Sequence, residues 1–144
     1  MKVRKKLGLL MAGLLLCSSI TVCAQTAYFS SFSFKTSAYQ DKTAEVTSAT
    51  KSSNEANWYY TITSLAGVDT PSSGKFFYLE PNYSGGGLGC AIPAIISSST
   101  TRNVSLQSSY YDACPQNVTY TLYARSNDAY GDSMYAIFSG YFMP

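Results

Sequence analysis

The sequence predicts an all-β protein: a single antiparallel β-sandwich of about seven strands, immunoglobulin-like or jelly-roll-like, that follows a cleaved signal peptide. Two observations predict the sandwich. Aromatic and Thr-rich stretches recur at short spacing between turns of Gly, Ser, Asn and Pro, and the helix formers Glu, Lys and Leu are scarce after residue 25. A small barrel is the alternative packing for such strands.

The first 24 residues have the three parts of a secretory signal peptide. A positive segment precedes an apolar run at residues 7–22, and Val22 and Ala24 stand at the −3 and −1 positions of a cleavage site before Gln25. The positive side chains are Lys2, Arg4, Lys5 and Lys6. We therefore expect residues 1–24 to be removed and residues 25–144 to form one secreted, extracellular domain that does not span a membrane.

Charge after the leader is sparse and slightly negative. Four of the ten Lys and Arg residues lie in residues 1–24, which leaves six basic against eight acidic side chains and a net charge of −2. This balance does not provide the basic surface that binds nucleic acid. The remaining 120 residues contain all 13 Tyr, 7 Phe and 1 Trp, which is typical of a packed domain and not of a disordered chain.

Three strands are expected before residue 65. In residues 28–35, Phe32 and Phe34 alternate with polar residues, the pattern of a half-buried strand. Residues 43–50 are rich in Thr, Ala and Val and alternate weakly. Residues 57–64 alternate strongly, with Trp58, Tyr60 and Ile62 on one face and Tyr59, Thr61 and Thr63 on the other.

The middle of the chain is less regular. Residues 75–80 form a short aromatic strand that ends at Pro81. The stretch 82–101 is Gly-rich and predicts an irregular segment, and residues 102–107 predict a modest strand.

Two clear strands close the domain, at residues 117–125 and 134–142. In the first, apolar residues alternate with Thr, Tyr and Arg, so one face is buried. The face expected to form the core carries Phe32, Phe34, Trp58, Tyr60, Ile62, Val118, Tyr120, Leu122, Phe138 and Phe142.

Two cysteines remain after the leader, Cys90 and Cys114. A single pair in an oxidising compartment predicts a disulfide, and the alternative is two free thiols. It would close a loop of 25 residues and contribute roughly 3.5 kcal/mol on a chain-entropy estimate.

The chemistry of known catalytic and cofactor sites is mostly absent from the sequence. There is no histidine, which removes Ser-His-Asp and Cys-His systems and most zinc sites, so we expect no enzyme activity and no cofactor. The remaining metal candidate is calcium, at a turn that carries Asn127, Asp128 and Asp132 beside Gly131.

The surplus of tyrosine is the positive functional signal. Tyr59, Tyr123 and Tyr135, with Tyr141 as a further candidate, project opposite the expected core face, and we expect this opposite face to be the binding surface. Tyrosine offers a rigid ring and a hydroxyl, which suits binding to a cell-wall polymer or an envelope protein. The competing interpretation is that these rings pack inside the sandwich.

Several segments share their residue types with a known group: Phe32-Ser33-Phe34, Trp58, and residues 75–79, 121–127 and 139–142. The layout resembles small secreted proteins of Gram-positive bacteria whose function is unknown and which are similar to lactococcin-type bacteriocins. The resemblance covers most of residues 25–144 and implies a secreted bacterial β-sandwich, without supplying catalytic residues.

These features together predict a secreted, non-enzymatic protein that recognises the cell envelope. The alternative is a bacteriocin-like effector that acts on the envelopes of competitors. A small hydrolase that uses a carboxylate pair is the third interpretation, and the missing histidine counts against it.

Overall fold

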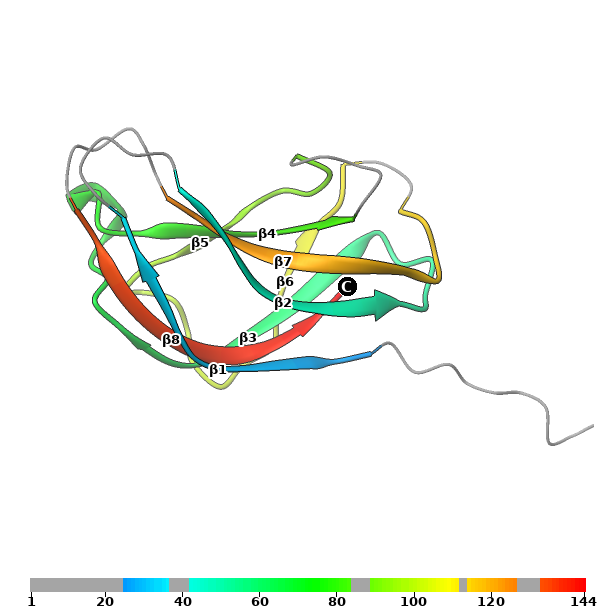
Figure 1. Cartoon of the computed structure of the whole chain (residues 1–144), viewed down its shortest axis with the longest axis horizontal. Coiled ribbons are helices and arrows are strands. Elements are labelled where there is room, and N and C mark those ends of the chain that lie inside the picture. The colour runs from blue at the N-terminus through cyan, green and yellow to red at the C-terminus, as the bar shows by residue number, and fades with distance from the viewer. Residues whose placement is uncertain (1–24, 37–41, 84–88, 112–113, 127–132) are drawn as a thin grey trace, which may run out of the picture.

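The computed structural model describes residues 25–36, 42–83, 89–111, 114–126 and 133–144 (Figure 1). These ranges contain eight strands and a 3-10 turn at Pro71–Ser73, and none of their helices is long and apolar enough to cross a membrane. The signal peptide predicted at residues 1–24 lies outside them. The strands are β1 (Ala27–Lys35), β2 (Thr43–Lys51), β3 (Asn57–Ala66), β4 (Phe77–Tyr83), β5 (Ala94–Ile96), β6 (Leu106–Ser109), β7 (Val118–Ser126) and β8 (Tyr135–Met143).

The prediction of seven strands is wrong by one, because it misses β5. This strand lies inside the segment 82–101 that the sequence predicts to be irregular. It has only three residues, and so short a run shows no alternation that could be separated from a loop. The neighbouring strand β6 also begins later than predicted, at Leu106.

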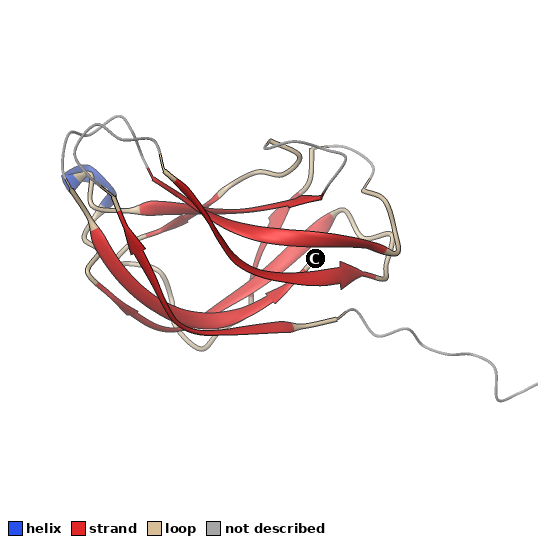
Figure 2. Cartoon of the chain, viewed as in Figure 1, coloured by secondary structure: helices blue, strands red, loops and turns tan. Residues whose placement is uncertain are grey.

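The eight strands form two four-stranded sheets that face each other, as Figures 1 and 2 show. Sheet A has the order β1-β8-β3-β6 and sheet B the order β2-β7-β4-β5, and all pairs are antiparallel. The predicted β-sandwich is confirmed. Because β1 lies beside β8, β2 beside β7, β3 beside β6 and β4 beside β5, the strand order is that of a jelly roll.

The core lies between the sheets and is largely aromatic. Phe77 of sheet B stacks on Phe138 of sheet A with ring centroids 4.7 Å apart, and Trp58 contacts the edge of Phe142 at 6.4 Å. The predicted core face is confirmed by eight buried residues: Phe34, Trp58, Tyr60, Ile62, Tyr120, Leu122, Phe138 and Phe142. Phe32 and Val118 are partly buried and pack against this cluster.

A glycine lets the two central strands of sheet A approach closely. Gly140 on β8 is paired with Ile62 on β3, and a Cβ at this position would collide with the carbonyl oxygen of Thr61 and lie 2.8 Å from the Phe29 ring. Only glycine fits here without a shift of the backbone. This contact sets the spacing of the side chains that project from β3 and β8.

The predicted disulfide is absent, and this corrects the sequence-based expectation. Cys90 and Cys114 are not joined by a disulfide, and each is partly buried. The Cys90 sulfur instead donates a hydrogen bond to the Pro81 carbonyl at 3.1 Å. Backbone pairing holds the two segments together: Ala91 bridges to Tyr110, and the amide of residue 111 donates to the Cys90 carbonyl at 3.1 Å. Burial, and then the nearby Cys114, raise the pKa of Cys90.

Candidate binding groove on the outer face of sheet A

Two cross-strand rows of side chains lie on the outer face of sheet A. In the first row, Tyr28 on β1 stands opposite Tyr141 on β8, which stands opposite Thr61 on β3. In the second row, Met143 on β8 stands opposite Tyr59 on β3. Rows on one face are two residues apart, roughly 6.6–6.8 Å. We call this group the platform; it comprises Tyr28, Tyr59, Thr61, Gln107, Tyr141 and Met143.

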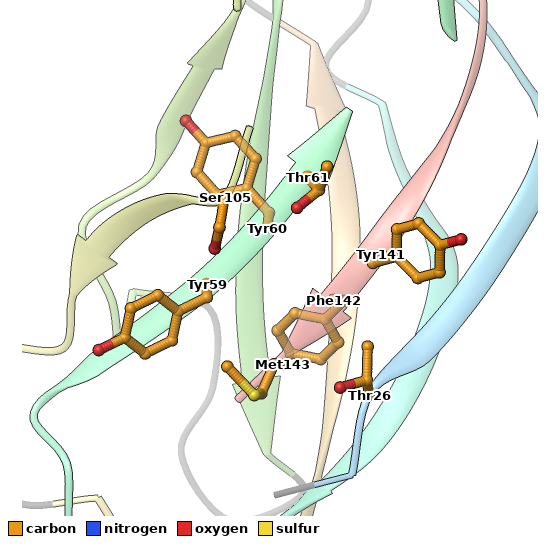
Figure 3. Close-up of a pocket in the computed structure, with 8 residues that line it drawn as sticks. All are labelled: Thr26, Tyr59, Tyr60, Thr61, Ser105, Tyr141, Phe142 and Met143. Carbon is orange, nitrogen blue, oxygen red and sulfur yellow. The ribbon is translucent and has the colours of Figure 1, made fainter. Parts of the chain in front are cut away.

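A shallow groove of about 220 Å³ crosses the platform (Figure 3). The rings of Tyr59 and Tyr141 project to opposite sides, with Thr61 and Met143 between them. The groove therefore has aromatic sides, an apolar thioether and hydroxyl groups. Its lining consists of Thr26, Tyr59, Tyr60, Thr61, Ser105, Tyr141, Phe142 and Met143.

Exposed aromatic surface continues from the groove onto β1. The rings of Tyr28 and Tyr141 are 5.1 Å apart and tilted by 46°. The side chain of Tyr28 is 56% exposed and that of Tyr141 is 44% exposed. An aromatic pair of this size left open to solvent is typical of a binding surface.

The groove is lined by uncharged side chains. The Glu55 carboxylate raises the pKa of Tyr59, chiefly through a hydrogen bond with the Tyr59 hydroxyl, followed by desolvation and by the charge of Glu55. Tyr59 is thus held as a neutral phenol with a negative charge beside its hydroxyl end.

The three predicted binding tyrosines do not share one surface. Tyr59 lies in the groove, whereas Tyr135 is on the same sheet at the opposite end of β8, paired with Lys35. Tyr123 is on β7 of sheet B, on the far side of the sandwich. The single surface predicted from the sequence is therefore wrong, because alternation tells which side chains face outward but not to which sheet their strand belongs.

Tyr123 has its own surroundings on the outer face of sheet B. Its hydroxyl donates to Glu45 on β2 at 3.3 Å. It borders a hollow of about 310 Å³, lined by Asn82, Tyr83, Thr119, Thr121 and Tyr123.

Next to Tyr123 on the outer face of sheet B, Arg125 and Glu80 form an ion pair. Arg125 lies 3.5 Å from the buried Glu80 carboxylate and 5.6 Å from the centre of the Tyr78 ring. The second oxygen of Glu80 accepts a hydrogen bond from the Gly89 amide at 2.6 Å. These charges satisfy each other, so the platform on sheet A remains the more open aromatic surface.

The described residues contain no group of three or more His, Cys, Asp or Glu side chains that could hold a metal ion. The calcium candidate Asn127, Asp128 and Asp132 lies outside these residues, so it stays a prediction. No catalytic residue was predicted, and the pairs Glu45–Tyr123 and Glu80–Arg125 are explained by their own contacts.

Comparisons with protein families, with curated proteins and with solved structures found no match to this chain.

Sequence reasoning missed most of the platform. Met143 and Tyr28 lie at the ends of their strands, where period-two patterns give little information. Tyr141 alternates with the buried Phe142, and this is the signal that marks it as outward-facing. Tyr28, Tyr141 and Met143 lie near Tyr59 because β1 pairs with β8 and β8 pairs with β3. These strands are far apart in sequence.

Proposed function

We propose that the protein is a secreted, non-enzymatic recognition protein that binds a component of the cell envelope through the platform on sheet A. The observation that carries this proposal is the open groove between Tyr59 and Tyr141, extended by the adjacent, tilted ring of Tyr28. The leader pattern at residues 1–24 supports secretion, and the missing histidine is consistent with a role that needs no catalysis.

Tyrosine rings at such a surface supply binding energy at a small entropic cost. Each ring has only two rotatable angles to fix, and its hydroxyl can hydrogen-bond at the edge of the interface. Aromatic side chains that exclude water dominate many interfaces, and loss of one such ring typically costs 2 kcal/mol or more. Removal of the two rings that flank the groove should therefore abolish useful affinity.

The test is retention of the purified secreted protein on washed cells and on isolated cell walls. We expect wild type to be retained and the Tyr59→Ala/Tyr141→Ala variant to lose retention while keeping its circular dichroism spectrum. Tyr123→Ala, on sheet B, and Tyr135→Ala, at the other end of β8, are matched controls that should still bind. Absence of retention for wild type, or an equal loss in Tyr123→Ala, contradicts the proposal.

The bacteriocin-like alternative is separated by a growth assay. A recognition protein binds the envelope without killing, whereas an effector lowers the viability of related strains at the concentrations that give retention. If wild type kills related strains and the Tyr59→Ala/Tyr141→Ala variant does not, the protein is an effector and the platform is the surface with which it binds its target.

A further inference from the structure

We propose that the platform binds an uncharged polysaccharide chain, with sugar rings lying against Tyr59 and Tyr141. This inference rests on the proposed function and names the ligand class of the same groove. It follows from the ring arrangement, the size of the groove, its hydroxyl groups and the surrounding charge.

The side chains of the groove match the two surfaces of a sugar ring. A pyranose presents C–H groups on its faces and hydroxyls around its rim. The faces of Tyr59 and Tyr141 and the thioether of Met143 offer apolar contact, while Thr26, Thr61 and Ser105 add hydroxyls to the lining of the groove. Each of these hydroxyls can donate one hydrogen bond and accept two.

Those hydroxyls remain available to a ligand. Within the part of the chain that the structure describes, Thr26, Thr61 and Ser105 make no side-chain hydrogen bond, although other Ser and Thr side chains nearby do. Ser108 on β6, for example, donates to the Ile92 carbonyl at 2.9 Å. The hydroxyls of Thr26, Thr61 and Ser105 are thus not used in side-chain hydrogen bonds within the described residues.

The size of the groove favours a polymer over a free small molecule. About 220 Å³ is below the roughly 300–1,000 Å³ of pockets that enclose drug-sized ligands. The platform, however, extends across four strands from Tyr28 on β1 to Gln107 on β6. Strands about 4.8 Å apart make this span about 14 Å, which accommodates several linked rings on an open surface.

The charge around the groove selects an uncharged chain. A polyanion would need Lys or Arg beside its acidic groups, and none of the described residues that line the groove is a Lys or an Arg. Instead, the carboxylate of Glu55 holds the Tyr59 hydroxyl and would repel an anionic sugar at that end. Lys35, on strand β1 of the same sheet, stands opposite Tyr135 at the other end of β8.

The experiment measures binding of the secreted protein to soluble oligosaccharides by calorimetry. The neutral probes are β-1,4-glucose, α-1,4-glucose, β-1,3-glucose and β-1,4-N-acetylglucosamine oligomers, and polygalacturonate is the anionic probe. We expect at least one neutral series to bind, with affinity that increases with chain length and changes little when salt is raised several-fold. Tyr59→Ala or Tyr141→Ala should weaken binding at least about tenfold, and Tyr135→Ala should not.

A conservative variant keeps the test valid if an alanine variant does not fold. Tyr59→Phe retains the ring and removes the hydroxyl that Glu55 holds, so it should keep most of the affinity for a neutral chain. An equal loss in Tyr59→Phe and Tyr59→Ala would show that the hydroxyl, not the ring face, carries binding, and would overturn the stacking.

The outcomes for the ligand class and for the proposed function can be told apart. Three results overturn the neutral-polysaccharide inference and leave envelope recognition standing. The protein is retained on envelopes but binds no neutral oligomer, it prefers polygalacturonate, or its retention is lost after the envelopes are treated with protease. Oligosaccharide binding without envelope retention supports the ligand class and contradicts the envelope as the target.

Discussion

At the scale of single residues, Lys51 is a charged side chain buried inside the fold. Its side chain is fully buried at the end of β2, and its ammonium lies 4.9 Å from the centre of the Tyr110 ring. Within the described residues, its nitrogen has no hydrogen-bond partner. Burial lowers the pKa of Lys51, and the nearby Cys114 and Glu55 only partly oppose this. The cation–π contact with Tyr110 therefore partly compensates the Lys51 ammonium for its lost hydration.

We predict that Lys51→Met stabilises the protein. Methionine fills similar space without a polar group, so the cost of burying an unsatisfied nitrogen is removed while the attraction to Tyr110 is lost. The expected net gain in the free energy of unfolding is about 1–2 kcal/mol at pH 7, measured by urea denaturation. A decrease would mean that the cation–π contact outweighs desolvation.

The pH dependence of stability provides a second prediction for this residue. Because the pKa of Lys51 is lower in the folded state than the ordinary value of about 10.4, the unfolded state binds more protons between the two values, and stability rises with pH there. Lys51→Met should remove that rise. Tyr110 and Tyr120, whose pKa values are raised chiefly by burial, lower stability above about pH 10 in both proteins. The difference between the two unfolding curves therefore isolates Lys51, and parallel curves would contradict the assignment.

At the scale of elements, strand β7 provides a test of the inward and outward faces. Leu122 is fully buried between the sheets, whereas the adjacent Thr121 points outward into the sheet B hollow. Leu122→Ala should lower the free energy of unfolding by about 2–5 kcal/mol, and Thr121→Ala should change it by less than about 0.5 kcal/mol. Equal losses in thermal or urea unfolding would show that both faces of β7 are packed.

The close approach of β3 and β8 predicts the effect of a single methyl group. In Gly140→Ala, the new Cβ would meet the Thr61 carbonyl, which belongs to the backbone and cannot rotate away. We expect a loss of about 1–3 kcal/mol in urea unfolding. The control is Ser64→Ala, at an exposed β3 position, which should be nearly neutral. Unchanged stability of Gly140→Ala would mean that the two strands can separate at no cost.

At the scale of the whole molecule, the sequence predicts strands and their buried faces well but not their partners. The alternation of Trp58, Tyr60 and Ile62 fixes which side of β3 is buried, since a one-residue slip would expose all three. Nothing in a single strand's pattern states that β3 pairs with β8 while β7 lies in the other sheet. For this reason Tyr59 and Tyr123 are both correctly predicted to face outward, yet they lie on opposite sides of the sandwich.

Gln25, the residue after the expected cleavage site, contacts strand β2. Its side-chain oxygen accepts a hydrogen bond from the Thr50 amide at 3.3 Å, and β1 starts two residues later at Ala27, so cleavage after Ala24 would leave this bond and β1 intact. We predict that intact-mass analysis of the secreted protein finds residues 25–144 with Gln25, free or cyclised, at the N-terminus. The sequence does not favour a lipid anchor, because the bulky Leu16 and Val22 precede the two leader cysteines, where a lipobox requires a small residue. A diacylglycerol adduct on Cys17 or Cys23 would instead tether the domain to a membrane and would replace free secretion with display at the cell surface.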